Sequence, residues 1–385
     1  MEYRALGATG MQVSRVGFGG EHLEGMEYRD VEAVVHAALD AGINMMDCFM
    51  AEPHVRSNIG KALGRRRPEM QIQGHIGACW LGGQYKRSRD LDQCKAAFSD
   101  LLTRMDTDYL DVGMIHYVDT QEDLSRMLEN GILDYAQELK QKGMIRAIGV
   151  SSHDPGVALS LVETGVIEVL MFSINAAYEL LDAGVSVDDL IKADLVREGK
   201  DLHGIHPARQ RLYEACEARG VGITVMKPFG AGKLLKEELS PFGAPMTPIQ
   251  CIHYCLTRPG VASVLAGYRS PAEVEAAVAY ESATPEERDY SPFLGATQLY
   301  SMAGNCMYCN HCLPCPARID VAQVNKYLDL ALVAEGKVPD TVREHYLAME
   351  THGEDCIACC SCESNCPFGV PVVERMKKAK EVFGR

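Results

Sequence analysis

Long hydrophobic runs are absent from this chain of 385 residues, since no stretch reaches the roughly 18 uninterrupted apolar residues that a membrane-spanning helix needs. Residues 1–4 are not followed by a basic segment and an apolar core, so we expect no secretory signal and a cytoplasmic protein. Positive charge is in deficit, and the net charge is -15. Because phosphate contacts require a positive surface, we expect neither nucleic acid nor membrane as a partner.

Cysteine, by contrast, is abundant, and eight of the 15 cysteines form two runs near the C-terminus. The second run has the C-x2-C-x2-C-x3-C-P spacing of bacterial ferredoxins, and the first has one residue fewer before its last cysteine. Each run ends in Cys-Pro, which favours iron-sulfur ligation over paired zinc knuckles or over disulfides, which require an oxidising compartment. The spacing therefore predicts two [4Fe-4S] clusters.

The fourth ligand of each cluster is expected to come from the other run, as in two-cluster ferredoxins. The first predicted set is Cys306, Cys309, Cys312 and Cys366. The second predicted set is Cys356, Cys359, Cys362 and Cys315. Cys360 is left over and is not predicted to be a ligand. The six cysteines before residue 303 lack ligand spacing and are expected to be buried apolar residues.

A chain of this length is expected to form two domains, because single cores rarely grow beyond about 250–300 residues. Segment 284–295 is polar and contains two prolines, so it is expected to link residues 1–283 to a domain at 296–385. Eight short apolar runs before this linker are compatible with buried parallel strands. They are residues 13–19, 43–47, 70–74, 109–116, 145–150, 168–172, 222–226 and 262–267.

Amphipathic segments at 30–41, 91–105, 121–141 and 271–280 separate these runs, and Asp90, Thr120 and Ser270 mark helix starts. The alternation predicts an α/β fold, a (β/α)8 TIM barrel with its active site at the carboxyl ends of the strands. Residues 182–210 are too long for a usual connection, and they either cover the barrel mouth or form an insertion without a role. Helical spacing at 320–335 and 341–351 predicts an α-helical ferredoxin domain.

Several strand ends carry family landmarks. These are residues 3–7, 16–19, 42–47, 108–111 with His116, 145–151 and 259–267. In this order they resemble the aldo/keto reductase family over residues 1 to about 283. With its cysteine-rich tail the chain is similar to the branch that carries a C-terminal ferredoxin-type domain. The resemblance implies a barrel that binds NADP(H) without a Rossmann fold and transfers a hydride to a carbonyl, with a Tyr, Lys, Asp and His set supplying the proton.

This resemblance places Asp47 and His116 at the family's Asp and His positions, but it places Glu52 where the tyrosine should be and His75 where the lysine should be. A Glu beside a His is an acid-base pair with lower starting pKa values than Tyr and Lys. We therefore expect a protonated His75, held by Glu52 or Asp47, to donate the proton while His116 orients the substrate oxygen.

The resemblance also implies a nucleotide site. Ser151 and Ser152 match the Ser-Asn pair that holds the nicotinamide amide, with Ser152 in place of Asn. The other positions that it implies for the ring, the pyrophosphate and the 2'-phosphate are Asn175, Lys227, Gly230, Gly267 and Arg269. The family's C-terminal Arg-x-x-x-Glu-Asn pattern is not intact, so loss of NADP(H) binding is an open alternative.

Histidines at predicted strand ends suggest a different chemistry. They are His22, His54, His75, His116 and His153. If they converge at the barrel mouth, they could ligate zinc, manganese or iron; the alternative is that His22, His54 and His153 are polar loop residues. No H-x-H or H-E-x-x-H spacing supports a metal.

Three classes of function stay open at this stage. Clusters move single electrons while nicotinamide delivers a hydride, and no flavin motif is visible, so an external ferredoxin or flavodoxin is the expected electron partner. The first class is therefore an iron-sulfur oxidoreductase acting on a small organic carbonyl or hydroxyl compound. The second is a non-enzymatic electron-transfer protein on a relict barrel, and the third a metal-dependent lyase or hydrolase.

Overall fold

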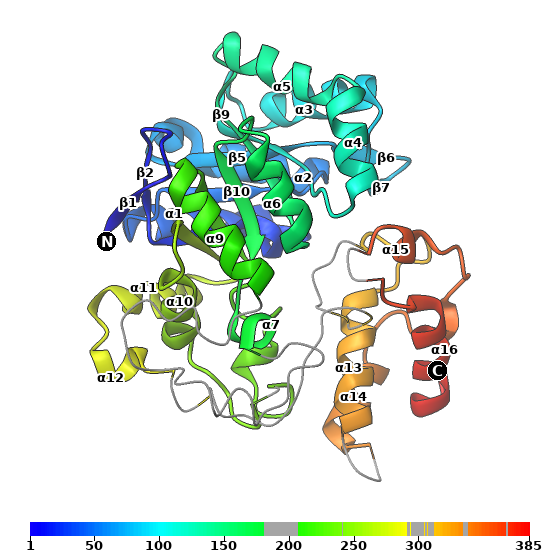
Figure 1. Ribbon diagram of the computed structural model, residues 1–385. Helices are drawn as coiled ribbons and strands as arrows, with labels where there is room; N and C mark the ends of the chain where they lie inside the picture. Colours follow the sequence, from blue (N-terminus) through cyan, green and yellow to red (C-terminus); the bar gives the residue numbers. More distant parts are fainter. Residues whose placement is uncertain are drawn as a thin grey trace.

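The computed structural model describes residues 1–180, 207–240, 242–290, 293, 304, 306, 312–333, 338–366 and 369–385. Eight parallel strands close into a barrel in the chain order predicted from the sequence (Figure 1). They are β3 (Val16–Gly19), β4 (Met45–Cys48), β5 (Gln71–Ile76), β8 (Leu110–Ile115), β9 (Ile145–Ser152), β10 (Val169–Ser173), β11 (Gly222–Met226) and β12 (Val261–Gly267). The predicted (β/α)8 barrel is confirmed.

The strands are buried on both faces, which explains why their sequences are runs of apolar residues rather than alternating patterns. Met45, Val112 and Met171 pack inside the barrel. The antiparallel hairpin of β1 (Tyr3–Ala5) and β2 (Gln12–Ser14) precedes the barrel, and Leu6 and Val13 join the same interior cluster. The hairpin therefore closes one end of the barrel and leaves the carboxyl ends of the strands as the open end.

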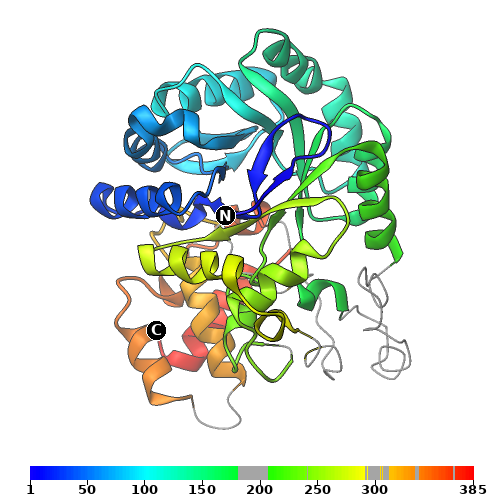
Figure 2. The same ribbon diagram turned by 90° about the vertical axis from the view of Figure 1, so that its left-hand side faces the viewer.

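The strands alternate with helices that cover the outside of the barrel (Figure 2). These helices are α1 (Tyr28–Asp40), α2 (Pro53–Leu63), α3 (Leu91–Arg104), α4 (Gln121–Glu129), α5 (Ile132–Gln141), α6 (Pro155–Glu163), α9 (Pro207–Arg219), α10 (Pro248–Leu256) and α11 (Pro271–Val278). Asp90, Thr120 and Ser270 cap their helices as predicted, because each side chain accepts a backbone N–H three residues later. The helix predicted at 121–141 is two helices, since Gly131 adopts a left-handed φ of 82°.

A second hairpin, of β6 (Ala78–Leu81) and β7 (Gln84–Arg87), follows β5 directly and was not predicted from the sequence. Its two-residue turn is Gly82-Gly83, and both glycines have positive φ, 63° and 77°. Two left-handed residues make the turn that matches the twist of a tight hairpin, and glycine adopts this conformation without strain. The hairpin carries Tyr85 into the protein, where it is 4% exposed.

The described part of the chain after the barrel consists of helices and connecting turns. It contains α13 (Val321–Val333), α14 (Asp340–Leu347), α15 (Ser361–Ser364) and α16 (Val372–Phe383). Tyr346 stacks on Phe383 with ring centroids 4.0 Å apart, and Arg375 on α16 pairs with Asp329 on α13 at 2.5 Å. These helices lie beside the barrel in both views (Figures 1 and 2), and Asn365 Nδ2 donates to the Tyr85 carbonyl oxygen at 3.2 Å.

Some predictions fall wholly or partly outside the described residues. Of the predicted insertion at 182–210, residues 182–206 lie outside them, and α9 begins at Pro207. The predicted linker is helical at its start, where Thr284 caps the short helix α12 (Pro285–Arg288), and the domain boundary stays a prediction. Among the described helices, none is long and apolar enough to cross a membrane.

Candidate active site

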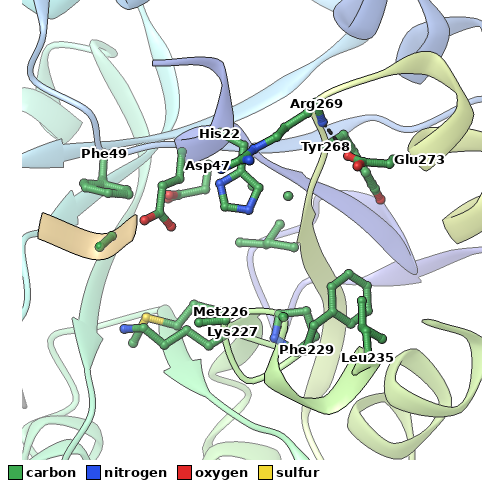
Figure 3. A pocket seen from close by; sticks show the side chains of 18 of the residues that line it. His22, Asp47, Phe49, Met226, Lys227, Phe229, Leu235, Tyr268, Arg269 and Glu273 are labelled. Atoms are coloured by element: carbon green, nitrogen blue, oxygen red, sulfur yellow. Dashed lines mark hydrogen bonds between the residues drawn. The ribbon is translucent and has the colours of Figure 1, made fainter. Parts of the chain in front are cut away.

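A cavity of about 420 Å³ opens at the carboxyl ends of the strands, where the barrel architecture predicts the active site. Asp47, His22 and Arg269 lie on one side, and Met226, Lys227 and Phe229 face them from the other (Figure 3). The wall also includes residues from the helical part after the barrel, among them Gln323 and Lys326. The site is therefore bounded by two regions that are far apart in the sequence.

Three of the four predicted catalytic residues meet at this cavity and are hydrogen-bonded in a row. His75 Nε2 lies 2.9 Å from Asp47 Oδ1, and His75 Nδ1 lies 2.7 Å from His116 Nδ1. The row ends with Tyr85, whose hydroxyl contacts His116 Nε2. All four side chains are at most 4% exposed. Asp47, His75, His116 and Tyr85 together form what we call the proton chain.

The partners of the proton chain fix the direction of its hydrogen bonds when both imidazoles are neutral. A carboxylate only accepts, so His75 Nε2 donates to Asp47 and His75 Nδ1 must accept. His116 Nδ1 then donates to His75, and His116 Nε2 accepts from the Tyr85 hydroxyl. Gln73 Nε2 supports Asp47 by donating to the same Oδ1 at 2.7 Å. Each donor therefore has an acceptor, as buried polar groups require.

Phe49 packs the proton chain from the cavity side. Its ring stacks on His116 with centroids 5.8 Å apart and an interplanar angle of 12°, and it meets Tyr85 edge to face. Buried aromatic contacts of this kind restrict side-chain rotation and exclude water. His116 is consequently held by Phe49 on one face of its ring and by hydrogen bonds at both nitrogens.

Glu52, the fourth predicted catalytic residue, does not join this row. Its carboxylate accepts the backbone N–H of Val55 at 2.6 Å and caps α2. Of the two carboxylates expected to hold His75, Asp47 does so. The alignment placed Glu52 at the position of the family tyrosine, but the residue stands at the helix start, where an acidic side chain is favoured by the free N–H groups.

A carboxyl group that was not predicted, Glu21, lines the cavity instead. It follows β3 in the 3-10 helix η1 (Gly20–Leu23), and its Oε1 is buried without a hydrogen-bond partner in the described structure. Burial raises the pKa of Glu21 to about 8; Lys227 opposes the rise, and Glu24 and Asp47 add to it. Glu21 is therefore a carboxylic acid near neutral pH, in a position where it can donate a hydrogen bond.

The predicted nucleotide residues divide into two groups. Ser151, Lys227, Gly267 and Arg269 line the cavity, and the buried hydroxyl of Ser151 has no partner among the described residues. Gly267 is needed for close packing, because a Cβ there would lie 2.6 Å from the ring of His22.

The other three support the walls. Ser152 donates to Asp119 at 3.2 Å, and Asn175 Nδ2 donates to the Lys227 carbonyl oxygen at 3.0 Å. Gly230 turns the loop after β11 with a φ of 56°.

Lys227 brings a positive charge to the cavity. Its Nζ donates to His153 Nε2 at 2.8 Å, and His153 Nδ1 donates in turn to Asp119 at 2.8 Å. Burial and then the charge of Lys227 lower the pKa of His153. The neutral imidazole of His153 thus connects the Lys227 ammonium group to the Asp119 carboxylate by two hydrogen bonds. These bonds fix the position of the ammonium group at the cavity rim.

The predicted histidine cluster is only partly present. His22, His75, His116 and His153 line the cavity, whereas His54 is exposed on α2. In the part of the chain that the structure describes, no group of three or more His, Cys, Asp or Glu side chains is arranged to hold a metal ion. The metal-dependent alternative gains no support from this site.

The structure describes every cysteine of the two runs except Cys309. Cys362 is buried, and its pKa is raised to about 12, first by burial and then by the charges of neighbours that include Cys315 and Cys356. Cys315 belongs to the first run and Cys362 to the second, so the charge of one run acts on a thiol of the other. The six cysteines before residue 303 are buried, as predicted.

An eight-stranded (β/α)8 barrel with an Asp, two His and a candidate nucleotide loop at its open end has the architecture of the TIM-barrel enzymes. The family model of the aldo/keto reductases matches residues 15–247, and the chain belongs to this family. The family membership and the oxidoreductase names of its relatives support an oxidoreductase enzyme.

Two curated relatives span most of the barrel. The uncharacterized oxidoreductase YqkF of Bacillus subtilis is 25% identical over 273 residues, which are 69% of this chain and 87% of the relative. L-galactose dehydrogenase of Arabidopsis thaliana is 26% identical, over 72% of this chain and 88% of the relative. Among solved structures, the holo form of aldo-keto reductase AKR11C1 from Bacillus halodurans has a TM-score of 0.59 and 25% identity, covering 78% of this chain and 98% of that one.

Proposed function

We propose that the protein is a cytoplasmic, NADP(H)-dependent oxidoreductase of a small carbonyl or hydroxyl compound, with a His-based proton donor and two [4Fe-4S] clusters. The proton chain that ends in the cavity carries this proposal. The residues of the cavity wall favour a bound nucleotide. Lys227 and Arg269 give the rim positive charge, and the Ser151 hydroxyl has no hydrogen-bond partner among the described residues. A nicotinamide bound there would supply or accept the hydride.

The protein's own residues supply the proton. One extra proton on the His75–His116 pair is balanced by Asp47. Every ring nitrogen of the pair already contacts Asp47, the other ring or Tyr85, so the pair gives this proton to a carbonyl oxygen when the substrate oxygen takes the place of one of these partners. In the oxidation direction the same pair accepts the proton. Tyr85 holds His116 through Nε2, so the Nδ1 edge of His116 stays directed at His75. Chemically, this pair replaces the Tyr and Lys that the family resemblance implies.

The test is substitution of the central histidine. We expect His75→Gln to lower kcat for NADPH-dependent reduction of a carbonyl panel by roughly 10²–10⁴-fold, the usual contribution of a general acid. The fold should survive, since glutamine can still donate to Asp47, and circular dichroism checks it. His36→Gln on α1 is the matched control, because His36 does not line the cavity and its ring is held to the Ala62 carbonyl oxygen. An unchanged kcat for His75→Gln would show that the His75–His116 pair does not transfer the proton.

The cysteine runs are proposed to hold the two clusters, with Cys306, Cys309, Cys312 and Cys366 on one and Cys356, Cys359, Cys362 and Cys315 on the other. The electrostatic effect of Cys315 in the first run on Cys362 in the second supports ligation across the two runs. Clusters held there would exchange single electrons with an external ferredoxin or flavodoxin. Iron-sulfur clusters are ligated by cysteine thiolates, and the two runs supply cysteines at the spacing found in ferredoxins.

Anaerobic purification tests this assignment. The protein should carry about eight irons and absorb broadly near roughly 400 nm, as two cubanes require. Cys309→Ala should remove about half of the iron. Cys360, next to Cys359, is not assigned as a ligand, so the Cys360→Ala variant should keep all of its iron. Iron-free protein, or equal loss in both variants, would contradict the ligand sets.

A further inference from the structure

Two cysteines at the base of the β6–β7 hairpin lie outside both the cavity and the cysteine runs. Cys79 is on β6 and Cys94 is in the first turn of α3, and both side chains are fully buried. Cys79 Sγ donates to the carbonyl oxygen of Gln93, the residue before Cys94, at 3.7 Å. Cys94 Sγ lies 3.5 Å from the carbonyl oxygen of Ser88, which follows β7 directly. The hairpin and α3 therefore bring together two thiols, which we call the hairpin thiols.

The hairpin thiols also bond to each other. Their side-chain hydrogen bond raises the pKa of Cys79 and lowers the pKa of Cys94. Burial adds to the rise at Cys79 and opposes the fall at Cys94. Of the two, Cys94 is therefore the thiol that ionises more readily, and Cys79 is its protonated partner. No disulfide joins them in this structure.

A guanidinium group stands beside Cys94. Arg89 Nη1 donates at 3.4 Å to the same Ser88 carbonyl oxygen that Cys94 Sγ approaches. Arg89 also pairs with the buried carboxylate of Asp123 at 2.7 Å, which fixes its position. The charge of Arg89 helps to lower the pKa of Cys94, and Asp90 opposes it. A cysteine that is held next to an arginine in this way reacts as its thiolate.

The other cysteines of the barrel lack these features. Burial raises the pKa of Cys48 and of Cys216 to about 12. Cys251 and Cys255 stand four residues apart on α10, and burial raises the pKa of both. Among the six cysteines before residue 303, Cys94 alone has a lowered pKa, so the barrel contains one thiol suited to oxidation and one partner in contact with it.

We propose that Cys79 and Cys94 form a reversible disulfide when the protein meets hydrogen peroxide, and that this bond joins the β6–β7 hairpin to α3. The Cys94 thiolate attacks one oxygen of the peroxide, the O–O bond breaks, and hydroxide leaves, which gives a sulfenic acid on Cys94. The Cys79 sulfur then attacks the sulfenic sulfur, and the released hydroxide takes the Cys79 proton to form water. In total, two thiols lose two electrons and two protons, and the peroxide becomes two molecules of water.

The disulfide would act on the proton chain through the hairpin. The loop that it closes, residues 79–94, contains β7 and Tyr85, whose hydroxyl contacts His116. A cross-link reduces the number of open conformations available to such a loop, so it stabilises the closed hairpin. Neither the nucleotide nor the clusters take part in this reaction, and it therefore stands apart from the proposed function.

Peptide mass mapping of the full-length protein tests the proposal. Protein purified without oxygen is exposed to equimolar hydrogen peroxide, denatured in an alkylating reagent and digested. We expect a linked pair of peptides that contain Cys79 and Cys94, two hydrogen atoms lighter than the separate thiol peptides and separated again by dithiothreitol. Cys251 and Cys255, the other neighbouring buried pair, should be recovered as alkylated thiols and are the matched control.

A variant and an exchange measurement complete the test. Cys79→Ser keeps a donor for the Gln93 carbonyl oxygen, so the fold should persist, and Cys94 should then gain one oxygen atom without forming a link. In the oxidised wild type, backbone amides of residues 78–87 should exchange hydrogen at least about tenfold more slowly than in the reduced protein. Recovery of both hairpin thiols in alkylated form with peroxide in excess would overturn the proposal. A wild-type Cys94 that carries added oxygen atoms instead of a link to Cys79 would overturn it as well.

Discussion

The positions of Asp47, His75 and His116 show how much of an active site can be predicted from single residues in the sequence. Each stands at or just after a predicted strand end, and the barrel brings such ends to one rim. Their proximity was therefore predictable, but their hydrogen-bond order was not. The sequence offered both Glu52 and Asp47 as partners for His75, and only backbone geometry directs Asp47 to the imidazole and Glu52 to the start of α2.

Glu21 shows the converse, because nothing in its sequence context signals a buried acid. Burial raises its pKa to about 8, so the folded protein keeps this proton between the unfolded value near 4.5 and pH 8. The folded state binds more protons than the unfolded state in that window, and stability falls as pH rises through it.

Glu21→Gln tests this consequence for stability. A glutamine carries no charge to bury, so the variant should melt at least about 2 °C above wild type at pH 9, and the difference should shrink at pH 5. Glu163→Gln, at the exposed end of α6, is the control and should shift Tm equally at both pH values. A Tm difference for Glu21→Gln that does not depend on pH would show that this carboxyl titrates normally.

The β6–β7 hairpin is the element that completes the proton chain. Its segment lies between β5 and α3, and its Gly82-Gly83 turn is a recognisable hairpin signal. Tyr85 could have been found from that signal, since the residue after such a turn is in a strand. Which side chain the strand would present to His116 depends on how the hairpin folds back over the barrel rim.

Tyr85→Phe measures what this hydroxyl contributes. We expect kcat to fall roughly tenfold, less than the 10²–10⁴-fold of a direct acid, and the pH profile of kcat to move because His116 loses a partner at Nε2. Tyr135→Phe, a partly buried tyrosine packed on Phe98, is the control. If Tyr85 positions His116, the pH profile of kcat must change in the variant. A loss of protein stability with an unchanged pH profile would show that Tyr85 contributes only packing.

At the scale of the whole molecule, the helical segment touches the site from two directions. Gln323 and Lys326 reach the cavity wall, and Asn365, next to Cys366, holds the backbone of Tyr85. The segment that carries the proposed clusters is therefore in direct contact with the end of the proton chain. A conformational change in that segment would therefore act on His116 through Tyr85 of the β6–β7 hairpin.

Asn365→Ala should loosen this link. The substitution deletes the hydrogen bond from the Asn365 amide to the Tyr85 carbonyl oxygen, which contributes roughly 1 kcal/mol, so backbone amides of residues 78–87 should exchange hydrogen about fivefold faster. Residues of α1, on another part of the barrel, serve as the internal control. Equal exchange rates in the hairpin of both proteins would mean that the contact does not stabilise it.

Local patterns in the sequence determined the elements: apolar runs became the eight barrel strands, and capping residues began the helices. Such features depend on neighbours along the chain, which a sequence displays directly. Only the tertiary structure decided that Tyr85 meets His116, that Glu52 caps a helix and that Lys326 lines the same cavity as Arg269. These contacts join residues from separate elements, and they arise from the packing of surfaces whose relative positions no local pattern specifies.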